Sequence, residues 1–369
     1  MESNTNKNVL IGLSGGVDSA VAAYLLKNDG FTVKAATLKM SDAPAKDSAD
    51  TASADTASAD AAASDDISDA AAVAGQLGID HFVVDLRERF RESVINYFVK
   101  SYLSGETPNP CVFCNRNMKF PCMAEFAKSV GCGFVATGHY AVVKKDTASG
   151  RYLLLKGADN KKDQSYMLYA LNQEMLSKVI FPLGNLTKEK IREIAGDIHL
   201  NVASKRDSQD ICFIRNGDYS GFIRNFTGMT PKSGNFCDAD GKIVGTHKGI
   251  CSYTVGQRKG LGISSEEPYY VTGKDADKNV VLLGREKDLY SSRVYVSNEN
   301  YIAFEKPTGS FRATAKLRYS HHDSPCTVFP EENGMILEFD SPQRAVTPGQ
   351  SAVLYDGDTV LCGGTIKQG

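Results

Sequence analysis

The stretch VLIGLSGGVDSAVAAYLLKNDG, residues 9–30, decides the fold class. It opens with a short apolar run, Val9–Leu13, of the kind that forms a buried strand, and continues with apolar residues at helical spacing over Ser19–Lys27. Small residues fill the turn between them, and Gly30 ends the helix before a second strand-like run, Phe31–Leu38. The stretch therefore predicts a strand, a helix and a second strand, with a glycine-rich turn after the first strand.

The same alternation of strand and helix signals continues along the chain. Helical spacing occurs over Ile67–Leu77, Arg87–Tyr102, Thr187–His199 and Asp218–Phe226, and strand-like runs occur over His81–Leu86 and Gly133–Thr137. In the third of these helices we expect Thr187 as N-cap, with Lys188, Glu189 and Lys190 exposed. Such alternation predicts an α/β fold in which helices cover both faces of a parallel sheet.

Beyond Gly234 the pattern changes to short alternating runs separated by Gly, Pro and Asp, which predicts strands. Examples are Tyr269–Thr272, Val280–Leu283, Arg312–Arg318 and Met335–Phe339. We therefore predict three domains: a Rossmann-like parallel-sheet domain over residues 1–220, a small central β-rich domain over 221–290, and a C-terminal β-barrel over 291–369.

Composition excludes several classes of protein. The chain has 369 residues, 42% hydrophobic and 23% charged, which is typical of globular proteins and not of disordered or fibrous ones. It contains no apolar run of about 18 residues, and its polar start lacks a secretory signal. Nine cysteines at irregular spacing do not fit a secreted disulfide scaffold. We therefore expect a cytoplasmic protein with no membrane partner.

One segment departs from this globular pattern. Residues 48–60 read SADTASADTASAD, a repeat without large apolar side chains, and we predict a disordered insertion over about residues 41–66. Residues 41–71 contain eight Asp and one Lys, so this stretch carries −7 and the rest of the chain +5. The net charge of −2 therefore still permits a basic surface elsewhere that binds nucleic acid.

The turn SGGVDS, residues 14–19, is suited to binding phosphate. Two glycines let backbone N–H groups converge on an anion, and the following helix points its positive end at the same place. Asp18 is a candidate Mg²⁺ ligand, and Ser14 and Ser19 offer hydroxyls. The alternative is a tight turn in which Ser19 caps the helix. Neither GxxxxGK[ST] nor GxGxxG occurs here.

The cysteines offer further chemistry. Cys111 and Cys114 form a CxxC after Pro108 and Pro110, and we predict a helix beginning near Asn115. A helix start, with Arg116 and Lys119 following, favours a thiolate. A structural zinc site would need two more ligands at similar spacing. Taken alone, Cys212 between Ile211 and Phe213 reads as a buried core cysteine. We assign the remaining six to packing: Cys122, Cys132, Cys237, Cys251, Cys326 and Cys362.

Six motifs in order give the chain a family resemblance. SGGVDS, TPNPCVFCN, TGHYA, KDQSYMLY, SQDICFI and GQRKGLGI together resemble the tRNA-specific 2-thiouridylases of the MnmA type, members of the PP-loop ATP pyrophosphatases. The resemblance implies that ATP, with Mg²⁺, adenylates O2 of the wobble uridine in tRNAs for Lys, Glu and Gln. Sulfur from a cysteine persulfide then replaces that oxygen, giving 2-thiouridine, AMP and pyrophosphate. A sulfur donor protein, such as a cysteine desulfurase or a sulfur carrier, is a further implied partner.

The resemblance also implies roles for particular residues. Cys114 matches the catalytic nucleophile and Cys212 the persulfide carrier, so that a Cys114–Cys212 disulfide would remain after transfer. ATP would bind at Gly12, Leu13, Ser14, Gly15, Gly16, Val17, Asp18, Ser19, Leu38 and Gly138. The target base would meet Asn109, Pro110 and Cys111. Positions matching tRNA contacts are His139, Lys162, Asp163, Gln164, Arg318, Tyr319 and Gln350.

The chain departs from the family pattern at two places. Many members have Asp where Cys111 stands, which leaves an alternative in which Cys111, Cys114 and Cys212 bind a [4Fe-4S] cluster that delivers the sulfur. Where relatives often have Cys-Cys-Ser, this chain has Ala62, Ala63 and Ser64, and we expect the acidic insertion there to project away from the RNA.

Two other functions fit parts of the sequence. One is a PP-loop enzyme that adenylates a different substrate, and the other is a non-catalytic RNA-binding or iron–sulfur module. The intact residues of the SGGVDS turn argue against the second.

Overall fold

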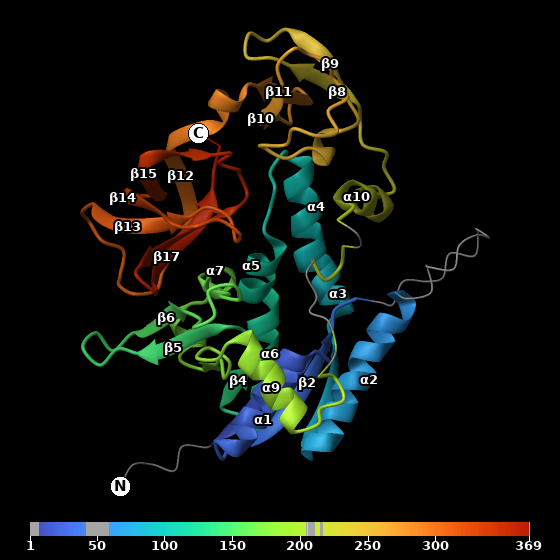
Figure 1. Cartoon of the computed structure of the whole chain (residues 1–369), viewed down its shortest axis with the longest axis vertical. Coiled ribbons are helices and arrows are strands. Elements are labelled where there is room, and N and C mark those ends of the chain that lie inside the picture. Colours follow the sequence, from blue (N-terminus) through green and yellow to red (C-terminus); the bar gives the residue numbers. More distant parts are fainter. Residues whose placement is uncertain (1–6, 42–58, 204, 206–210, 215–216, 369) are drawn as a thin grey trace, which may run out of the picture. The chain divides into compact units, whose positions relative to one another are not determined.

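The computed structural model describes residues 7–41, 59–203, 205, 211–214 and 217–368, with residues 59–65 described by their backbone. The chain forms two compact units (Figure 1). The first unit contains residues 1–93 and 114–209, and the second contains residues 94–113 and 210–369. Two segments of the chain therefore contribute to each unit.

A parallel sheet of five strands forms the centre of the first unit, in the order β3-β2-β1-β4-β7. The strands are β1 (Asn8–Gly12), β2 (Thr32–Lys39), β3 (Asp80–Asp85), β4 (Phe134–Ala136) and β7 (Val179–Ile180). Because β2 and β3 lie on one side of β1, and β4 and β7 on the other, the strand order reverses between β1 and β4. Open α/β sheets bind ligands at such a switch point, outside the carboxyl ends of the strands.

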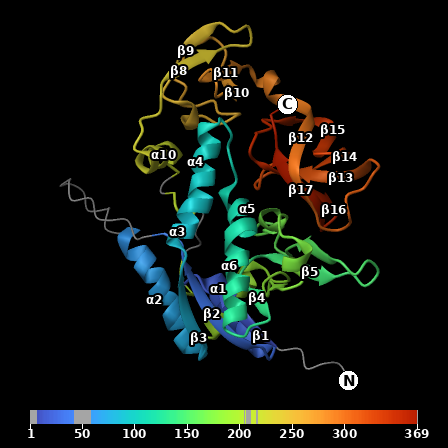
Figure 2. The ribbon, with the colours of Figure 1, turned by 180° about the vertical axis from the view of Figure 1, so that it is seen from behind.

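Helices cover both faces of this sheet. Val9 and Ile11 of β1 share one core with α1 (Val17–Asn28), α2 (Ala59–Leu77) and α9 (Lys188–Asp197). Alternate residues of a strand point to opposite faces, and α6 (Phe120–Ser129) contacts β1 and β4 from the other side. Figure 1 looks onto the face with α9 and Figure 2 onto the face with α6.

Shorter elements complete the first unit. A hairpin of β5 (Ala141–Lys145) and β6 (Tyr152–Lys156) follows β4, and two short helices follow it, α7 (Ser165–Leu168) and α8 (Gln173–Leu176). Between β3 and β4 the chain runs through α3 (Arg87–Phe90), a π-helical turn η1 (Arg91–Ile95), α4 (Asn96–Leu103), α5 (Pro110–Cys114) and a second π-helical turn, η2 (Asn115–Lys119). Residues 94–113 of this stretch, with α4 and most of α5, belong to the second unit. The predicted helix Arg87–Tyr102 is therefore present, with a π-helical turn inside it.

The second unit contains two β structures. A sheet in the order β10-β11-β8-β9 comprises β8 (Gly234–Cys237), β9 (Ile243–His247), β10 (Tyr270–Asp275) and β11 (Val280–Gly284). Six antiparallel strands then form a barrel: β12 (Tyr290–Tyr301), β13 (Phe311–Lys316), β14 (Ser324–Glu331), β15 (Gly334–Arg344), β16 (Ser351–Asp356) and β17 (Thr359–Ile366). The pairing of β12 with β17 closes this barrel.

Besides α4 and residues 110–113 of α5, three helical segments are described in the second unit. They are α10 (Tyr219–Thr227) and the 3₁₀ turns η3 (Ile250–Ser252) and η4 (Glu286–Leu289). In α10 the Asp218 side chain accepts a hydrogen bond from the Gly221 N–H and caps the helix. Among the described residues, no helix has the length and apolar character needed to cross a bilayer.

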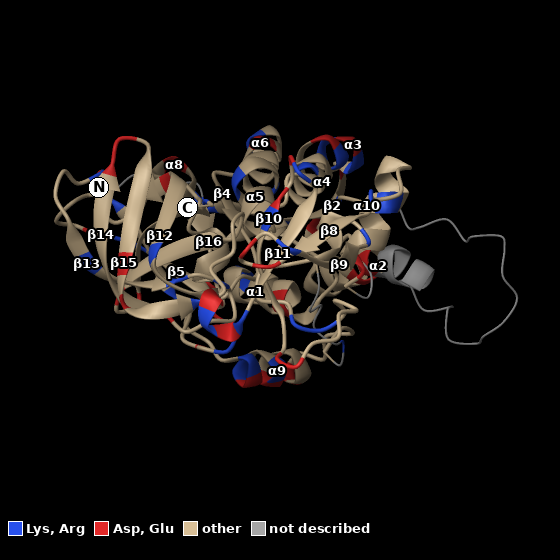
Figure 3. Cartoon of the chain, turned by 90° about the horizontal axis from the view of Figure 1, so that it is seen from above, with Lys and Arg blue, Asp and Glu red and all other residues tan. Residues whose placement is uncertain are grey.

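The predicted fold class is confirmed, and two local predictions are wrong. Helix α2 begins at Ala59, so the predicted disordered insertion does not extend to residue 66; residues 42–58 lie outside the described part. Lys188 was expected to be exposed, but it is buried. Glu189 and Lys190 are exposed as expected. Figure 3 shows positive and negative residues interspersed along α9, which is why the pattern suggested exposure for Lys188 too. The three-domain division stays a prediction.

Candidate active site

The glycine-rich turn follows β1 at the carboxyl edge of the parallel sheet, beside the switch point between β1 and β4. Gly15 has a φ of +71°, and a Cβ added there would lie 2.4 Å from the Asp66 carbonyl oxygen in α2. Gly16 precedes α1 in an extended conformation. A side chain at Gly15 would both strain the backbone and collide with α2, so this position requires glycine.

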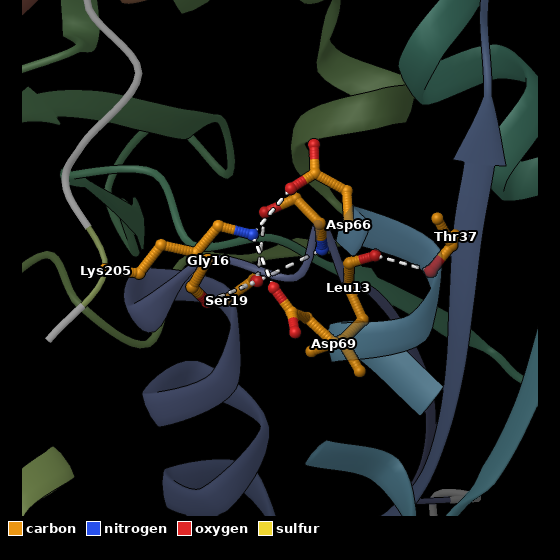
Figure 4. A network of polar contacts seen from close by, with 8 residues as sticks. Leu13, Gly16, Ser19, Thr37, Asp66, Asp69 and Lys205 are labelled. Carbon is orange, nitrogen blue, oxygen red and sulfur yellow. Dashed lines mark hydrogen bonds and ion pairs between the residues drawn. The ribbon is translucent and has the colours of Figure 1, made fainter. Parts of the chain in front are cut away.

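Hydrogen bonds within the turn fix its shape (Figure 4). The buried Ser19 hydroxyl donates to the Gly16 carbonyl oxygen at 3.0 Å and accepts from the Ser14 N–H at 3.1 Å. Ser19 therefore bonds back to the turn from within α1 and does not stand at the N-cap, which is Gly16. The preceding Leu13 carbonyl accepts from the buried Thr37 hydroxyl at 2.7 Å. The turn is held rigid before any ligand arrives.

The chain after β4 packs tightly against this turn. A Cβ added to Gly138 would lie 2.9 Å from the Asp18 carbonyl carbon and 2.9 Å from the Ser19 nitrogen. Gly12, the last residue of β1, similarly faces Met123, and Leu38 lies half-buried near the end of β2. The structure thus brings Gly138 against the first turn of α1.

Asp18 has partners that the sequence did not predict. Its Oδ1 atom accepts from the Tyr140 hydroxyl at 2.7 Å and from the Lys188 ammonium at 2.7 Å. Lys188 is the first residue of α9 and is 8% exposed. A cation is disfavoured at a helix N-terminus by the helix dipole, and a lysine in that place is the signal that could have revealed a nearby carboxylate. In this structure Asp18 Oδ1 is therefore the acceptor of an ion pair with Lys188.

A second ion-pair cluster holds the middle of α2 (Figure 4). The Lys205 ammonium donates to Asp66 Oδ1 and to Asp69 Oδ2, each at 2.6 Å. Although burial works against the charge, these two hydrogen bonds raise the pKa of Lys205. Asp66 also lies against Gly15, so this cluster fixes α2 next to the glycine-rich turn.

The CxxC lies within a helix that begins earlier than predicted. Asn109 is the N-cap, because its Oδ1 accepts from the Val112 N–H at 3.2 Å, and Pro110 occupies the first helical position of α5. The prediction of a helix start near Asn115 is therefore wrong, since Asn-Pro is itself a start signal. Cys111 is half-buried and lies in the first turn of α5. Cys114 is 8% exposed, is the last residue of α5, and is the first residue of the second segment of the first unit.

Cys212 is exposed, which overturns its interpretation as a core cysteine. Its neighbours Ile211, Phe213 and Ile214 pack into an apolar cluster with Phe98, and the rings of Phe98 and Phe213 meet edge to face at 5.3 Å. Anchored neighbours on both sides therefore present an accessible thiol. The cysteines assigned to packing are buried except Cys237, which is half-buried, and burial raises the pKa of Cys326 to about 12.

The residues that match tRNA contacts in the first unit are used in internal bonds. The buried Asp163 carboxylate accepts from the Gly157 N–H and from Ser165, and the Gln164 side-chain carbonyl accepts from the Tyr140 N–H at 3.0 Å. Lys162 is half-buried.

His139 lies between Phe120 and Phe181, with Nδ1 2.7 Å from the Thr137 hydroxyl. Burial, and secondarily the charge of Lys119, hold the pKa of His139 well below its usual value, so its ring is neutral at pH 7.

The matching residues of the second unit differ in exposure. Tyr319 is 37% exposed, and the Lys316 ammonium lies 5.6 Å from the centroid of its ring. Arg318 and Gln350 make hydrogen bonds to backbone carbonyls within the unit.

In the part of the chain that the structure describes, no group of three or more His, Cys, Asp or Glu side chains is arranged to hold a metal ion.

The fold and site define a class. A glycine-rich turn at the switch point of a parallel sheet, followed by a helix, is a typical place for an anion to bind. Residues 7–216 match the family described as tRNA methyl transferase HUP domain, residues 220–285 its PRC-barrel domain, and residues 291–366 an aminomethyltransferase beta-barrel domain.

Relatives narrow the class to one family. The chain is 47% identical over 367 residues to tRNA-specific 2-thiouridylase MnmA 1 of Caldanaerobacter subterraneus subsp. tengcongensis, covering 98% of both chains. It is 45% identical over 364 residues to tRNA-specific 2-thiouridylase MnmA of Acetivibrio thermocellus, covering 98% of this chain and 100% of the relative. The chain belongs to the MnmA family of tRNA-specific 2-thiouridylases.

Among solved structures, NMN synthetase from Francisella tularensis aligns over 55% of this chain and 67% of its own, at 21% identity and a TM-score of 0.34. That likeness is too slight to carry an argument about this protein.

Proposed function

We propose that this protein is a tRNA-uridine 2-sulfurtransferase that uses ATP to thiolate the wobble uridine of tRNAs for Lys, Glu and Gln. The observation that carries the proposal is the rigid SGGVDS turn at the switch point, in a chain similar to named 2-thiouridylases over 98% of its length. Its backbone N–H groups and the start of α1 would bind the phosphates of ATP, with Mg²⁺ as counter-ion.

Activation comes first in the proposed reaction. A carbonyl oxygen is a very poor leaving group, so O2 of the uridine attacks the α-phosphate of ATP and pyrophosphate departs. The adenylated base can then lose AMP. Lys188, which pairs with Asp18 beside the turn, would supply positive charge close to the phosphates.

Sulfur transfer follows. The terminal sulfur of a persulfide on Cys212 attacks C2 and displaces AMP, which leaves a disulfide between the base sulfur and Cys212. The Cys114 thiolate then attacks the Cys212 sulfur, so that 2-thiouridine departs and a Cys114–Cys212 disulfide remains. An external dithiol reduces that disulfide, and a donor such as a cysteine desulfurase or a sulfur carrier reloads Cys212. The exposure of Cys212 supports such a carrier role, because a donor must reach the thiol.

The base has to leave the anticodon stack to be reached. We propose that Asn109, Pro110 and Cys111 hold it, and that residues 221–290 and 291–369 bind the tRNA through shape and phosphates. Exposed Tyr319 with Lys316 supports the barrel as a tRNA-binding domain.

Thiolation of a tRNA transcript for Glu tests the proposal. The protein is incubated with ATP, Mg²⁺, cysteine and a cysteine desulfurase, and the RNA is digested to nucleosides. We expect 2-thiouridine from the wild type, and none from Cys114→Ser or Cys212→Ser when a cysteine desulfurase supplies the sulfur. AMP formed without thiolated base would contradict the proposal.

A further inference from the structure

The segment that leads into the CxxC helix rests on a turn of the barrel, within the second unit. We call residues 106–108 the strap and residues 345–350 the barrel turn. The Thr107 N–H donates to the Pro348 carbonyl at 2.9 Å, and the Gln350 side-chain amide donates to the Thr107 carbonyl at 2.8 Å. The same amide lies 3.4 Å from the Pro108 carbonyl. The strap is thus held to the barrel turn through both the N–H and the carbonyl of Thr107.

The fit between the strap and the barrel turn is close. Gly349 has a φ of +90°, and a Cβ added there would lie 3.0 Å from Glu106 Cβ and from the Thr107 backbone. The Thr107 hydroxyl is buried and has no hydrogen-bond partner among the described residues. A buried hydroxyl without a hydrogen-bond partner lowers the stability of the folded state by about 1–3 kcal/mol. The backbone hydrogen bonds of the strap therefore form despite this cost.

Hydrogen bonds within the second unit also hold the barrel turn in place. Arg318 donates from Nη2 to the Ala345 carbonyl at 2.8 Å and to the Thr347 hydroxyl at 2.5 Å. Thr347 is 2% exposed, and its carbonyl accepts from the Gln350 N–H at 3.2 Å. The Gln350 carbonyl in turn accepts from the Ile366 N–H of β17 at 2.8 Å. The Gln350 side chain therefore extends from a fixed backbone.

The strap ends at the residue that caps the CxxC helix. Asn109 follows Pro108 directly, and its side chain caps α5 through the Val112 N–H. Gln350 thus fixes the two peptide groups immediately before the cap. Its amide donors are directed at Thr107 and Pro108 without any RNA present, so they already have partners.

We propose that Gln350 is a positioning residue: its amide clamps the strap to the barrel turn and so sets the place of Asn109 and Cys111 for the target base. This inference rests on the proposed function and adds a role within the protein to a residue whose family match implies contact with tRNA. Arg318, which matches another tRNA contact, braces the same barrel turn.

Hydrogen exchange tests the clamp without using catalysis. In Gln350→Met the side chain keeps its length and loses both donors, and amides of residues 107–113 are followed in the RNA-free protein. Loss of one net hydrogen bond of about 1 kcal/mol predicts exchange roughly 5- to 10-fold faster there. The matched control is Gln343→Met on β15, whose amide donates to the Ser341 carbonyl at 2.8 Å. We expect no change at residues 107–113 in the control.

Activity and binding complete the test. We expect Gln350→Met to lower kcat for thiolation relative to Gln343→Met, because the strap then positions Asn109 and Cys111 less precisely. Gln350→Glu, which also removes the donors, should behave alike against Gln343→Glu. Unchanged exchange at residues 107–113, or weaker tRNA binding with unchanged kcat, would overturn the inference. A wild type that makes no 2-thiouridine would refute the proposed function and leave the exchange result standing.

Discussion

The ion pair between Lys188 and Asp18 makes a quantitative prediction about the candidate ATP site. Lys188→Met removes the ammonium and leaves the Asp18 carboxylate with the Tyr140 hydroxyl alone. Breaking a buried pair costs about 3–5 kcal/mol. The Asp18 side chain is 30% exposed and the Lys188 side chain 9%, so water recovers part of that cost, and we expect about 2 kcal/mol. This corresponds to local opening of α1 and α9 roughly 30-fold more often.

Hydrogen exchange resolved by segment measures this opening in both helices without requiring two-state unfolding. The double variant Asp18→Asn with Lys188→Met completes a cycle, and we expect it to lose about 1–2 kcal/mol less than the two single variants together. The control is Arg312→Met, which breaks an exposed pair with Asp340, 58% and 50% exposed, and should cost under about 1 kcal/mol. Exchange in α1 that changes less than about threefold, or single effects that simply add, would refute a coupled pair.

Three further predictions concern the second unit. Burial lowers the pKa of Lys274 from 10.5 to about 8, so between these pH values the unfolded chain binds more protons than the folded one, and the free energy of unfolding rises with pH by about 3 kcal/mol in all. Lys274→Met should abolish the rise in thermal stability between pH 8 and 10. Wild type and variant whose thermal stabilities change in parallel with pH would contradict this. Asn109→Ala should cost about 1 kcal/mol of thermal stability through the lost cap, whereas Asn109→Ser keeps the cap, and equal losses in both would exclude the capping role. Cys111→Asp places a carboxylate in the first turn of α5, where the helix dipole favours it, and we expect this variant to thiolate tRNA. We also expect anaerobically purified wild type to be active without iron. Iron bound in stoichiometric amount by the wild type and absent from Cys111→Asp would instead favour the [4Fe-4S] cluster.

Local patterns predicted the parallel sheet well. An apolar run ending in a small-residue turn before a helical pattern admits few other folds, and the predicted strand Val9–Leu13 is observed as β1. The same applies to Thr187, whose hydroxyl caps α9 by accepting from the Lys190 N–H. Signals of this kind depend on residues that are close together in the sequence, so they can be recognised without the tertiary structure.

What the sequence did not predict depends on residues far apart in the chain. Lys188 and Asp18 are separated by 170 positions, and only the packing of α9 on α1 buries their ion pair. Cys212 has apolar neighbours, which suggested burial, but a chain passing over an aromatic cluster can bury its neighbours and leave the thiol outside. The start of α5 was missed for another reason: Asn109-Pro110 was read as an extended entry although it is also a helix-start signal.

An oxygen-isotope experiment tests most directly whether the base is activated by adenylation. A tRNA transcript for Glu carries ¹⁸O at O2 of its wobble uridine, and one turnover is run with ATP, Mg²⁺ and persulfide-loaded protein. We expect the label in the phosphate of AMP, in an amount equal to the 2-thiouridine formed. Thiolated base with unlabelled AMP, or label released as water, would show that the glycine-rich turn does not activate the oxygen that sulfur replaces.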